Sequence, residues 1–273
     1  MTSRKRKALP PWLQGVTVKK EDKVTIEEDK PSYCVKKTVS ETNCTANTGK
    51  KEPSSASDRD HKTCDQLLDP VTALGMTYDE YTFTGSIIYS HTNADTNIIC
   101  EELIQRQEES QDTKIVGFDT EWPVTYTKGS QAKTALVQVC VDDQKCYLFH
   151  VSCMPKFPVM LKKLIEMDNV KKVGLSIEGD IWKLGKDYDI RAKDIVQNSI
   201  IELKTLANKK LRSLENWSLE GLTKNTLRLR ISKDPDVRKC DWSQFPLPRN
   251  QQLYAATDAA VSLKIYNKLN SMK

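Results

Sequence analysis

Hydrophobic residues are sparse and aperiodic in the first 76 residues and become regular after them. Residues 38–57, for example, form a long polar run in which apolar side chains follow neither a helical nor a strand period. A segment of this kind buries too little apolar surface to offset the entropy that it loses on ordering. We therefore predict a disordered N-terminal tail over residues 1–76 and a folded domain over residues 77–273.

The first half of the predicted domain is rich in short β-type runs. Apolar and β-branched residues predict four strands, over residues 83–89, 114–119, 135–141 and 146–149. The last two runs are separated by a short polar segment, which indicates a β-hairpin. This half is therefore expected to form a sheet with antiparallel pairing.

Helical periodicity dominates the second half of the domain. Apolar spacings of three and four residues predict helices over 157–167, 179–188, 218–227 and 249–269, with a short strand over 172–176. Ser218 is a candidate N-cap for the third of these helices. Strands first, followed by alternating helices and strands, predict an α/β fold with three layers on a mixed sheet.

Composition excludes several classes of protein, including membrane-spanning and secreted proteins. It has 273 residues, with 42 Lys and Arg against 37 Asp and Glu. No apolar run approaches the ~18 residues of a membrane-spanning helix, and no secretory signal begins the sequence. The eight cysteines contain no CxxC pair, which indicates reduced thiols in a cytosolic or nuclear protein. We expect no membrane partner.

A compact basic cluster, Arg4 to Lys7, lies near the start of the tail. Short clusters of this type act as nuclear-import signals or as nucleic-acid contacts. We predict nuclear localisation from this cluster. The rest of the tail is a candidate surface for protein partners.

Four carboxylates lie where predicted elements end or pack together. Asp119 and Glu121 are two residues apart at the end of an extended run, so their side chains share one face. Asp180 lies at the start of a predicted helix, and Asp258 lies in an alanine-rich part of the last helix. Tyr254 precedes Asp258 by one helical turn and shares its face.

This arrangement suits the hydrolysis of a phosphodiester bond. Two hard cations about 4 Å apart can activate water, neutralise the phosphate and stabilise the leaving oxygen. Mg²⁺ is held by a few carboxylates together with water and substrate phosphate. Residue types and spacing alone leave open the alternative that the acidic pair is a solvated surface charge.

Three segments resemble the sequence motifs of the DEDD family of 3′–5′ exonucleases. They are residues 116–123, 173–184 and 253–259, of which the last resembles the tyrosine variant of the third motif. Four further segments resemble the Werner-type exonuclease domain within that family, namely residues 83–87, 145–152, 206–211 and 242–247. The resemblance covers residues 80–273.

The resemblance implies a ribonuclease-H-like fold and a 3′–5′ exodeoxyribonuclease. Its substrate would be the 3′ end of DNA, recessed or within structured duplex, and its cofactors two Mg²⁺ ions for which Mn²⁺ can substitute. Asp119, Glu121 and Asp258 would ligate the metals. Asp180 would complete the acidic cluster, and Tyr254 would orient the attacking water. A role in DNA repair, replication or genome maintenance is implied in the same way.

Candidate nucleic-acid contacts lie in and near the three motifs. Trp182 belongs to the second motif and Trp122 to the first, and the alternative for each is a place in the hydrophobic core. Residues 204–239 hold ten basic side chains against four acidic ones. Such a segment predicts phosphate contacts that are independent of sequence and sensitive to salt. We select Arg228 and Arg238 as the candidate contacts from this segment.

Three other interpretations compete with a DNA exonuclease. An RNA 3′-end exonuclease resembling ribonuclease D would use the same chemistry. A non-catalytic nucleic-acid-binding module would be expected to lose a carboxylate, and all four are present. A pure interaction adaptor finds support in the tail alone. No P-loop or helicase motif occurs, so the chain is expected to be a stand-alone relative or a shorter piece of a helicase-containing protein.

Overall fold

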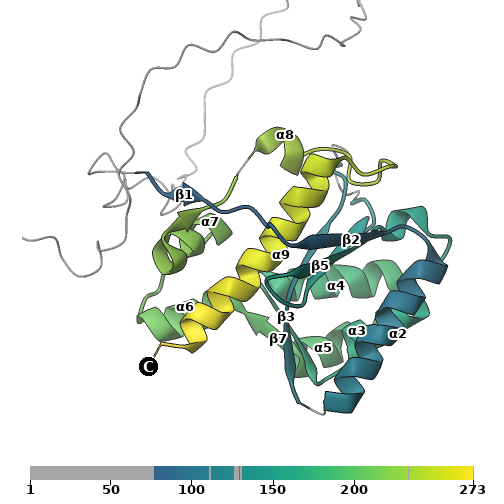
Figure 1. Cartoon of the computed structure of the whole chain (residues 1–273), viewed down its shortest axis with the longest axis horizontal. Helices are drawn as coiled ribbons and strands as arrows, with labels where there is room; N and C mark the ends of the chain where they lie inside the picture. Colours follow the sequence, from purple (N-terminus) through teal and green to yellow (C-terminus); the bar gives the residue numbers. More distant parts are fainter. Residues whose placement is uncertain (1–76, 111, 126–128, 130, 233, 273) are drawn as a thin grey trace, which may run out of the picture. The chain divides into compact units, whose positions relative to one another are not determined.

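The computed structural model of the chain, shown in Figure 1, describes residues 77–110, 112–125, 129, 131–232 and 234–272. The predicted tail over residues 1–76 lies outside the described residues, and so does its basic cluster. The tail and its boundary therefore stay predictions. In the described part of the chain, no helix combines the length and the apolar character needed to cross a membrane.

Among the described residues, six strands form one mixed sheet in the order β2-β5-β4-β3-β6-β7. The strands are β2 (Ser86–Ser90), β3 (Lys114–Glu121), β4 (Leu136–Cys140), β5 (Lys145–Phe149), β6 (Val170–Gly174) and β7 (Ile200–Glu202). Strand β4 runs antiparallel to both β3 and β5, which confirms the predicted hairpin. The other neighbouring pairs are parallel.

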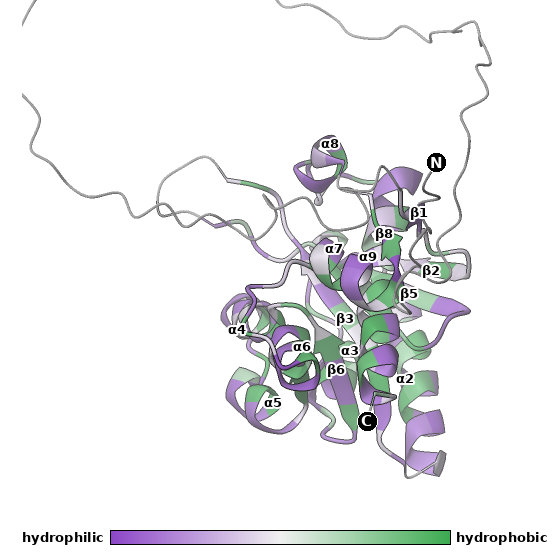
Figure 2. Ribbon diagram, turned by 90° about the vertical axis from the view of Figure 1, so that its left-hand side faces the viewer, coloured by the Kyte–Doolittle hydropathy of each residue, from purple (hydrophilic) through white to green (hydrophobic). Residues whose placement is uncertain are grey.

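Helices cover both faces of this sheet, so the predicted three-layer α/β fold is confirmed (Figure 1). One face is covered by α6 (Leu203–Leu211), α7 (Leu219–Leu222) and α9 (Arg249–Asn270). The other is covered by α2 (Asn93–Ser110), α3 (Val159–Glu166), α4 (Ile177–Tyr188) and α5 (Ala192–Asn198). Figure 2 shows hydrophobic residues gathered on the central strands between these two layers.

Strand β3 contributes alternate residues to the two faces. Val116 and Phe118 pack in the core beneath α2 to α5, whereas Gly117 faces α9. A Cβ atom on Gly117 would lie 1.9 Å from the carbonyl oxygen of Ala259, so glycine lets α9 cross directly over β3. The small alanines of α9 permit the same close approach. This crossing places Asp258, the neighbour of Ala259, next to the end of β3.

Several elements differ from the predictions. Strand β2 pairs with β5 in parallel, so the first half of the domain is not wholly antiparallel. Helix α2 was not predicted, because its buried stripe includes the polar residues Thr96 and Gln107. The helix predicted over 218–227 divides into α7 and a π-helical segment, Thr223–Leu227. There, the hydroxyls of Thr223 and Thr226 donate to carbonyls four residues earlier, a contact that bends helices.

Helices α5 and α6 and strand β7 were not predicted either. Four further short elements were also not predicted. They are β1 (Asp79–Glu80), β8 (Leu229–Arg230), α8 (Pro235–Arg238) and a 3₁₀ turn, Val151–Cys153. Strands β1 and β8 pair in parallel, and Arg230 forms an ion pair of 2.7 Å with Glu80. This pairing fixes the start of the described domain beside the segment that leads to α8.

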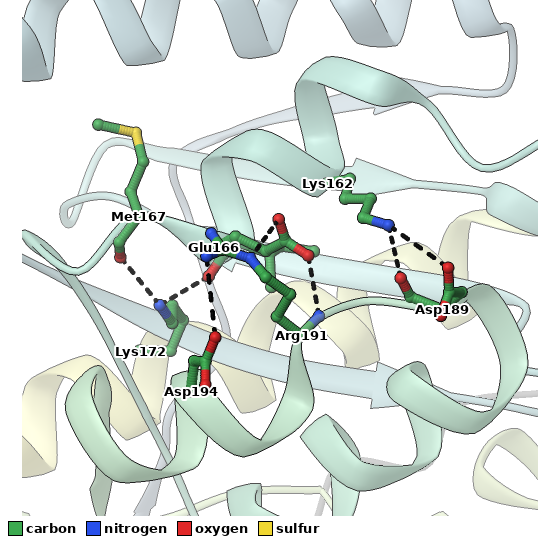
Figure 3. Close-up of polar contacts among 8 residues, drawn as sticks. Lys162, Glu166, Met167, Lys172, Asp189, Arg191 and Asp194 are labelled. Atoms are coloured by element: carbon green, nitrogen blue, oxygen red, sulfur yellow. Dashed lines mark hydrogen bonds and ion pairs between the residues drawn. The ribbon is translucent and has the colours of Figure 1, made fainter.

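Lys172 on β6 is a buried lysine that joins the sheet to two helix ends (Figure 3). Its Nζ donates to the carbonyls of Ile165 and Val170, each at 2.8 Å, to that of Met167 at 3.3 Å, and to Ser199 Oγ at 2.7 Å. Burial lowers the pKa of Lys172 to about 7. The amino group binds carbonyls at the C-terminal end of α3 and the hydroxyl of Ser199, which follows α5, and so joins both helices to the sheet.

Ion pairs lie near Lys172, between α3 and the segment that joins α4 to α5 (Figure 3). Arg191 contacts Glu166 at 3.1 Å and Asp194 at 3.8 Å, and Lys162 contacts Asp189 at 3.9 Å. Exposed pairs of this kind contribute only about 0–1 kcal/mol each.

Candidate active site

Three carboxylates meet where α9 crosses the end of β3. Asp119 and Glu121 come from β3 and Asp258 from α9, and each offers one carboxylate oxygen. These three oxygens lie within 4.8 Å of one another. Oxygen donors with several negative charges are the ligands that hard divalent cations prefer. The residues present therefore fit a cation of this type.

Electrostatics in this cluster favours protons or a cation. Burial raises the pKa of Asp119 to about 6, although the Thr120 N–H and the charge of Arg238 lower it. Burial, together with the neighbouring carboxylates, raises the pKa of Glu121 well above its usual range. The pKa of Asp258 is also raised, by burial first and then by the charge of Asp119. A divalent cation would replace these protons as the compensating charge.

Asp180 borders this cluster from the other face of β3. It lies in the first turn of α4, and its Oδ1 accepts a hydrogen bond from Thr120 Oγ1 at 2.8 Å. Burial, followed by the charge of Asp119, raises the pKa of Asp180 to about 8. Among the described residues, Asp119, Glu121 and Asp258 thus form the group that could hold a metal ion. Asp180 lies at the edge of this group.

The turn that leads into α4 is held by a residue that the sequence analysis missed. Ser176 has a left-handed backbone with a φ of 59°. Glu202, at the end of β7, accepts from the backbone N–H of Ser176 at 2.9 Å and of Lys204 at 3.2 Å. Glu202 therefore positions the turn that carries Asp180. No local sequence motif marks Glu202, because its partner Ser176 lies 26 residues away along the chain.

Tyr254 lies one turn before Asp258 and hydrogen-bonds to it. Burial, followed by the charge of Asp258, raises the pKa of Tyr254 above its usual range, so the hydroxyl stays neutral. Its ring contacts Trp242, with 6.0 Å between ring centroids. The adjacent Thr257 accepts a hydrogen bond from the Phe83 N–H at 3.1 Å. A neutral hydroxyl fixed in this way can orient a water molecule.

A cleft of about 620 Å³ opens over the carboxylates. Asp180, Tyr254 and Arg238 line it, as does Trp122, whose ring lies 4.9 Å from the ammonium of Lys183. Trp182 is 47% exposed on α4, and its indole donates to Glu178 at 3.3 Å. It is not among the described residues that line the cleft.

The predicted basic contacts divide into two groups. Arg238 and Lys239, at the end of α8, line the cleft. Others are paired within the domain, such as Lys224 with Glu220 at 2.8 Å. Arg228 is not among the described residues that line the cleft, and Lys233 lies outside the described part. The nucleic-acid roles of Arg228, Arg238 and the two tryptophans stay predictions.

A buried ion pair beside the cleft was also missed. Lys183 Nζ lies 2.9 Å from Asp187 Oδ2, and both side chains are largely buried. Asp187 also accepts from the backbone N–H and the hydroxyl of Thr134. Burial raises the pKa of Asp187, but the hydrogen bonds from Lys183 and Thr134 hold this pKa below its usual value. The pair ties α4 to the segment that enters β4, and its spacing of four residues was the available signal.

The fold and the acidic cleft define an α/β nuclease domain. Residues 91–273 match the family described as 3′–5′ exonuclease, and the chain belongs to this family. The Werner-type resemblance is confirmed, since 190 residues are 45% identical to the bifunctional 3′–5′ exonuclease/ATP-dependent helicase WRN of Mus musculus. That match covers 70% of this chain and 13% of the mouse protein.

Shorter relatives and solved structures agree with this assignment. The 3′–5′ exonuclease of Arabidopsis thaliana is 34% identical, over 70% of this chain and 65% of the relative. That of Drosophila yakuba is 31% identical, over 68% and 53%. The chain thus spans less than two thirds of each relative. The Aedes aegypti Nibbler EXO domain aligns with a TM-score of 0.56 at 20% identity, covering 70% of this chain and 92% of that one.

The catalytic core of RRP6 from Trypanosoma brucei aligns with a TM-score of 0.53 at 18% identity, over 70% of this chain and 48% of that chain. At such low identity, these two alignments show the fold alone. They confirm the predicted ribonuclease-H-like exonuclease fold. Together with the family match over residues 91–273, this fold assigns the described residues to a 3′–5′ exonuclease domain.

Proposed function

We propose that this domain hydrolyses phosphodiester bonds from the 3′ ends of DNA. The observation that carries the proposal is the group of three carboxylate oxygens within 4.8 Å, at the cleft of a chain that belongs to the 3′–5′ exonuclease family. Asp119, Glu121 and Asp258 would hold divalent cations, two Mg²⁺ or Mn²⁺ ions by our proposal. Such ions would neutralise the phosphate and lower the pKa of the attacking water.

The chain's own residues supply orientation and charge. Tyr254 is a neutral hydrogen-bonding group beside Asp258 and would orient the attacking water. Arg238 is the cation whose charge lowers the pKa values of Asp119 and Glu121, and it lines the cleft, where it would contact the substrate phosphate. Asp180 would act from the edge of the cluster, and Trp122 would form a wall of the nucleotide pocket.

The preference for DNA is inferred from the Werner-type motifs and the 45% identity to the mouse protein. RNA 3′ ends are the alternative substrate, since the same carboxylates would serve both and only a contact with the 2′-hydroxyl separates them. The basic cluster from Arg4 to Lys7 supports nuclear localisation. A role in DNA repair, replication or genome maintenance is part of the same proposal, and so are protein partners of the tail.

The proposal is tested with a 5′-labelled recessed duplex and an RNA strand of the same sequence. We expect a ladder that shortens from the DNA 3′ end in Mg²⁺ or Mn²⁺ and disappears in EDTA. Faster shortening of the RNA strand would show that RNA, rather than DNA, is the preferred substrate. Binding without cleavage of either strand would identify a non-catalytic module.

Tyr254→Phe is expected to slow cleavage by about 10–100-fold, because one hydrogen bond worth ~1–3 kcal/mol is lost. Single-turnover rates on the recessed duplex measure this effect. Tyr266→Phe is the matched control, since it removes a hydroxyl from the far end of the same helix. A loss as large as that caused by removing a carboxylate would show that Tyr254 does more than orient water.

A further inference from the structure

Gln138 is a buried polar residue that the proposed chemistry does not use. It lies in the middle of β4, where all five residues are buried, and its own exposure is 0%. Within the described part of the chain, neither its side-chain oxygen nor its side-chain nitrogen has a hydrogen-bond partner. A buried polar group left unpaired costs about 1–3 kcal/mol. The presence of an unpaired amide at this buried position therefore calls for a functional explanation.

The strand register places this amide beside the acidic cluster. Gln138 pairs directly with Asp119 across the antiparallel β3–β4 ladder. Directly opposed residues project from the same face of the sheet, with Cβ atoms about 4.5–5.5 Å apart. Leu136 and Leu148, which share that face, belong to the core beneath α9. Gln138 therefore faces the same layer as Asp119.

Gln138 has no direct route to the substrate. It is fully buried, and it is not among the described residues that line the cleft. Its surroundings beneath α9 are largely apolar, including Ala255, Ala256 and Ala259. The carboxylate of Asp119 is the side-chain acceptor that lies directly opposite Gln138 in the ladder. An effect of Gln138 on the reaction would pass through that carboxylate.

Asp119 has one oxygen with a local partner. Its Oδ1 accepts from the N–H of the next residue, Thr120, at 2.9 Å. A carboxylate that binds a cation with one oxygen leaves the other for a hydrogen bond from the protein. Hydrogen bonds of this kind fix the orientation of ligands, and their loss typically weakens metal binding by about 10–100-fold.

We propose that Gln138 is a positioning residue for the cation site. Its side-chain N–H donates to the Asp119 oxygen that does not bind the cation, and so holds that carboxylate in its binding orientation. The inference deepens the proposed function and depends on it. A hydrogen bond formed in the cation-bound arrangement would account for a buried amide that has no partner among the described residues.

The test compares Gln138→Met with the wild type by calorimetric titration with Mn²⁺ and by melting of the metal-free domain. Methionine keeps the length of the side chain and removes both polar atoms. We expect Mn²⁺ binding to weaken about 10–100-fold and the metal-free melting temperature to stay equal or rise. Gln138→Leu repeats the test with a second apolar side chain.

Gln107→Met is the matched control. Gln107 is buried on α2, and its amide already donates to the carbonyl of Asp112. This variant is expected to melt at a lower temperature and to bind Mn²⁺ as the wild type does. The Gln138 substitution is thus expected to weaken Mn²⁺ binding without loss of stability, and the Gln107 substitution to lower stability without loss of binding.

Each result has a separate meaning. Unchanged Mn²⁺ affinity in both Gln138 variants, with wild-type binding abolished by Asp119→Asn, would overturn the role of Gln138 alone. A wild-type domain that binds no Mn²⁺, or that binds it equally well with Asp119→Asn, would overturn both this inference and the proposed cation site. A marked loss of metal-free stability in both Gln138 variants, with unchanged Mn²⁺ affinity, would show a purely structural amide.

Discussion

Asp119→Asn is expected to lower the cleavage rate about 10³-fold or more while making the metal-free domain more stable. The rate falls because the site loses a ligand for cations that contribute several kcal/mol to the transition state, and each ~1.4 kcal/mol is tenfold in rate. Stability rises because burial holds the pKa of Asp119 at about 6, so ionisation near pH 7.5 opposes folding. Asparagine removes this cost, on the order of 1–3 kcal/mol.

Single-turnover cleavage and urea denaturation in EDTA measure the two effects on one preparation. Asp112→Asn is the control, since Asp112 is exposed and precedes β3 at the end opposite to the cluster. It is expected to change neither quantity. Cleavage at the wild-type rate by Asp119→Asn would refute the assignment of the site, and a less stable variant would refute the electrostatic account.

The sequence predicts best those elements whose hydrophobic pattern is strong. Helix α9 was predicted over 249–269 and runs from Arg249 to Asn270, and the β4–β5 hairpin was found from its two runs and polar turn. Helix α2 was not predicted because the polar residues Thr96 and Gln107 interrupt the hydrophobic pattern of its buried face. The parallel pairing of β2 escaped because strand direction depends on tertiary contacts rather than on local pattern.

The candidate site divides in the same way. Asp119, Glu121 and Asp258 were selected from motifs and spacing, and the fold brings them together. Residues that matter through partners distant in sequence were missed. Gln138 becomes notable only when the register sets it opposite Asp119, and Glu202 only when β7 lies beside the turn into α4. No pattern along the chain contains that information.

The carboxyls of the acidic cluster are expected to make the metal-free domain less stable as the pH rises from about 4 to 8. A carboxyl whose pKa is raised on folding keeps its proton while the unfolded chain releases it. The folded state therefore binds more protons, and the free energy of unfolding falls with pH. The window begins near the unfolded pKa of ~4 and ends near the folded values, about 6 for Asp119 and about 8 for Asp180. Melting curves in EDTA at several pH values measure this loss.

Divalent cations should reverse the trend. Binding displaces the protons of the cluster, so it strengthens as the pH rises. A cation at 100 times its dissociation constant stabilises the folded state by ~2.7 kcal/mol. The rise in melting temperature on adding Mn²⁺ should therefore be larger at pH 7.5 than at pH 5.5. Asp119→Asn should reduce both the pH dependence and the response to Mn²⁺, because the same carboxyl carries part of each. A response to Mn²⁺ that is independent of pH would show that the cation binds away from the raised carboxyls.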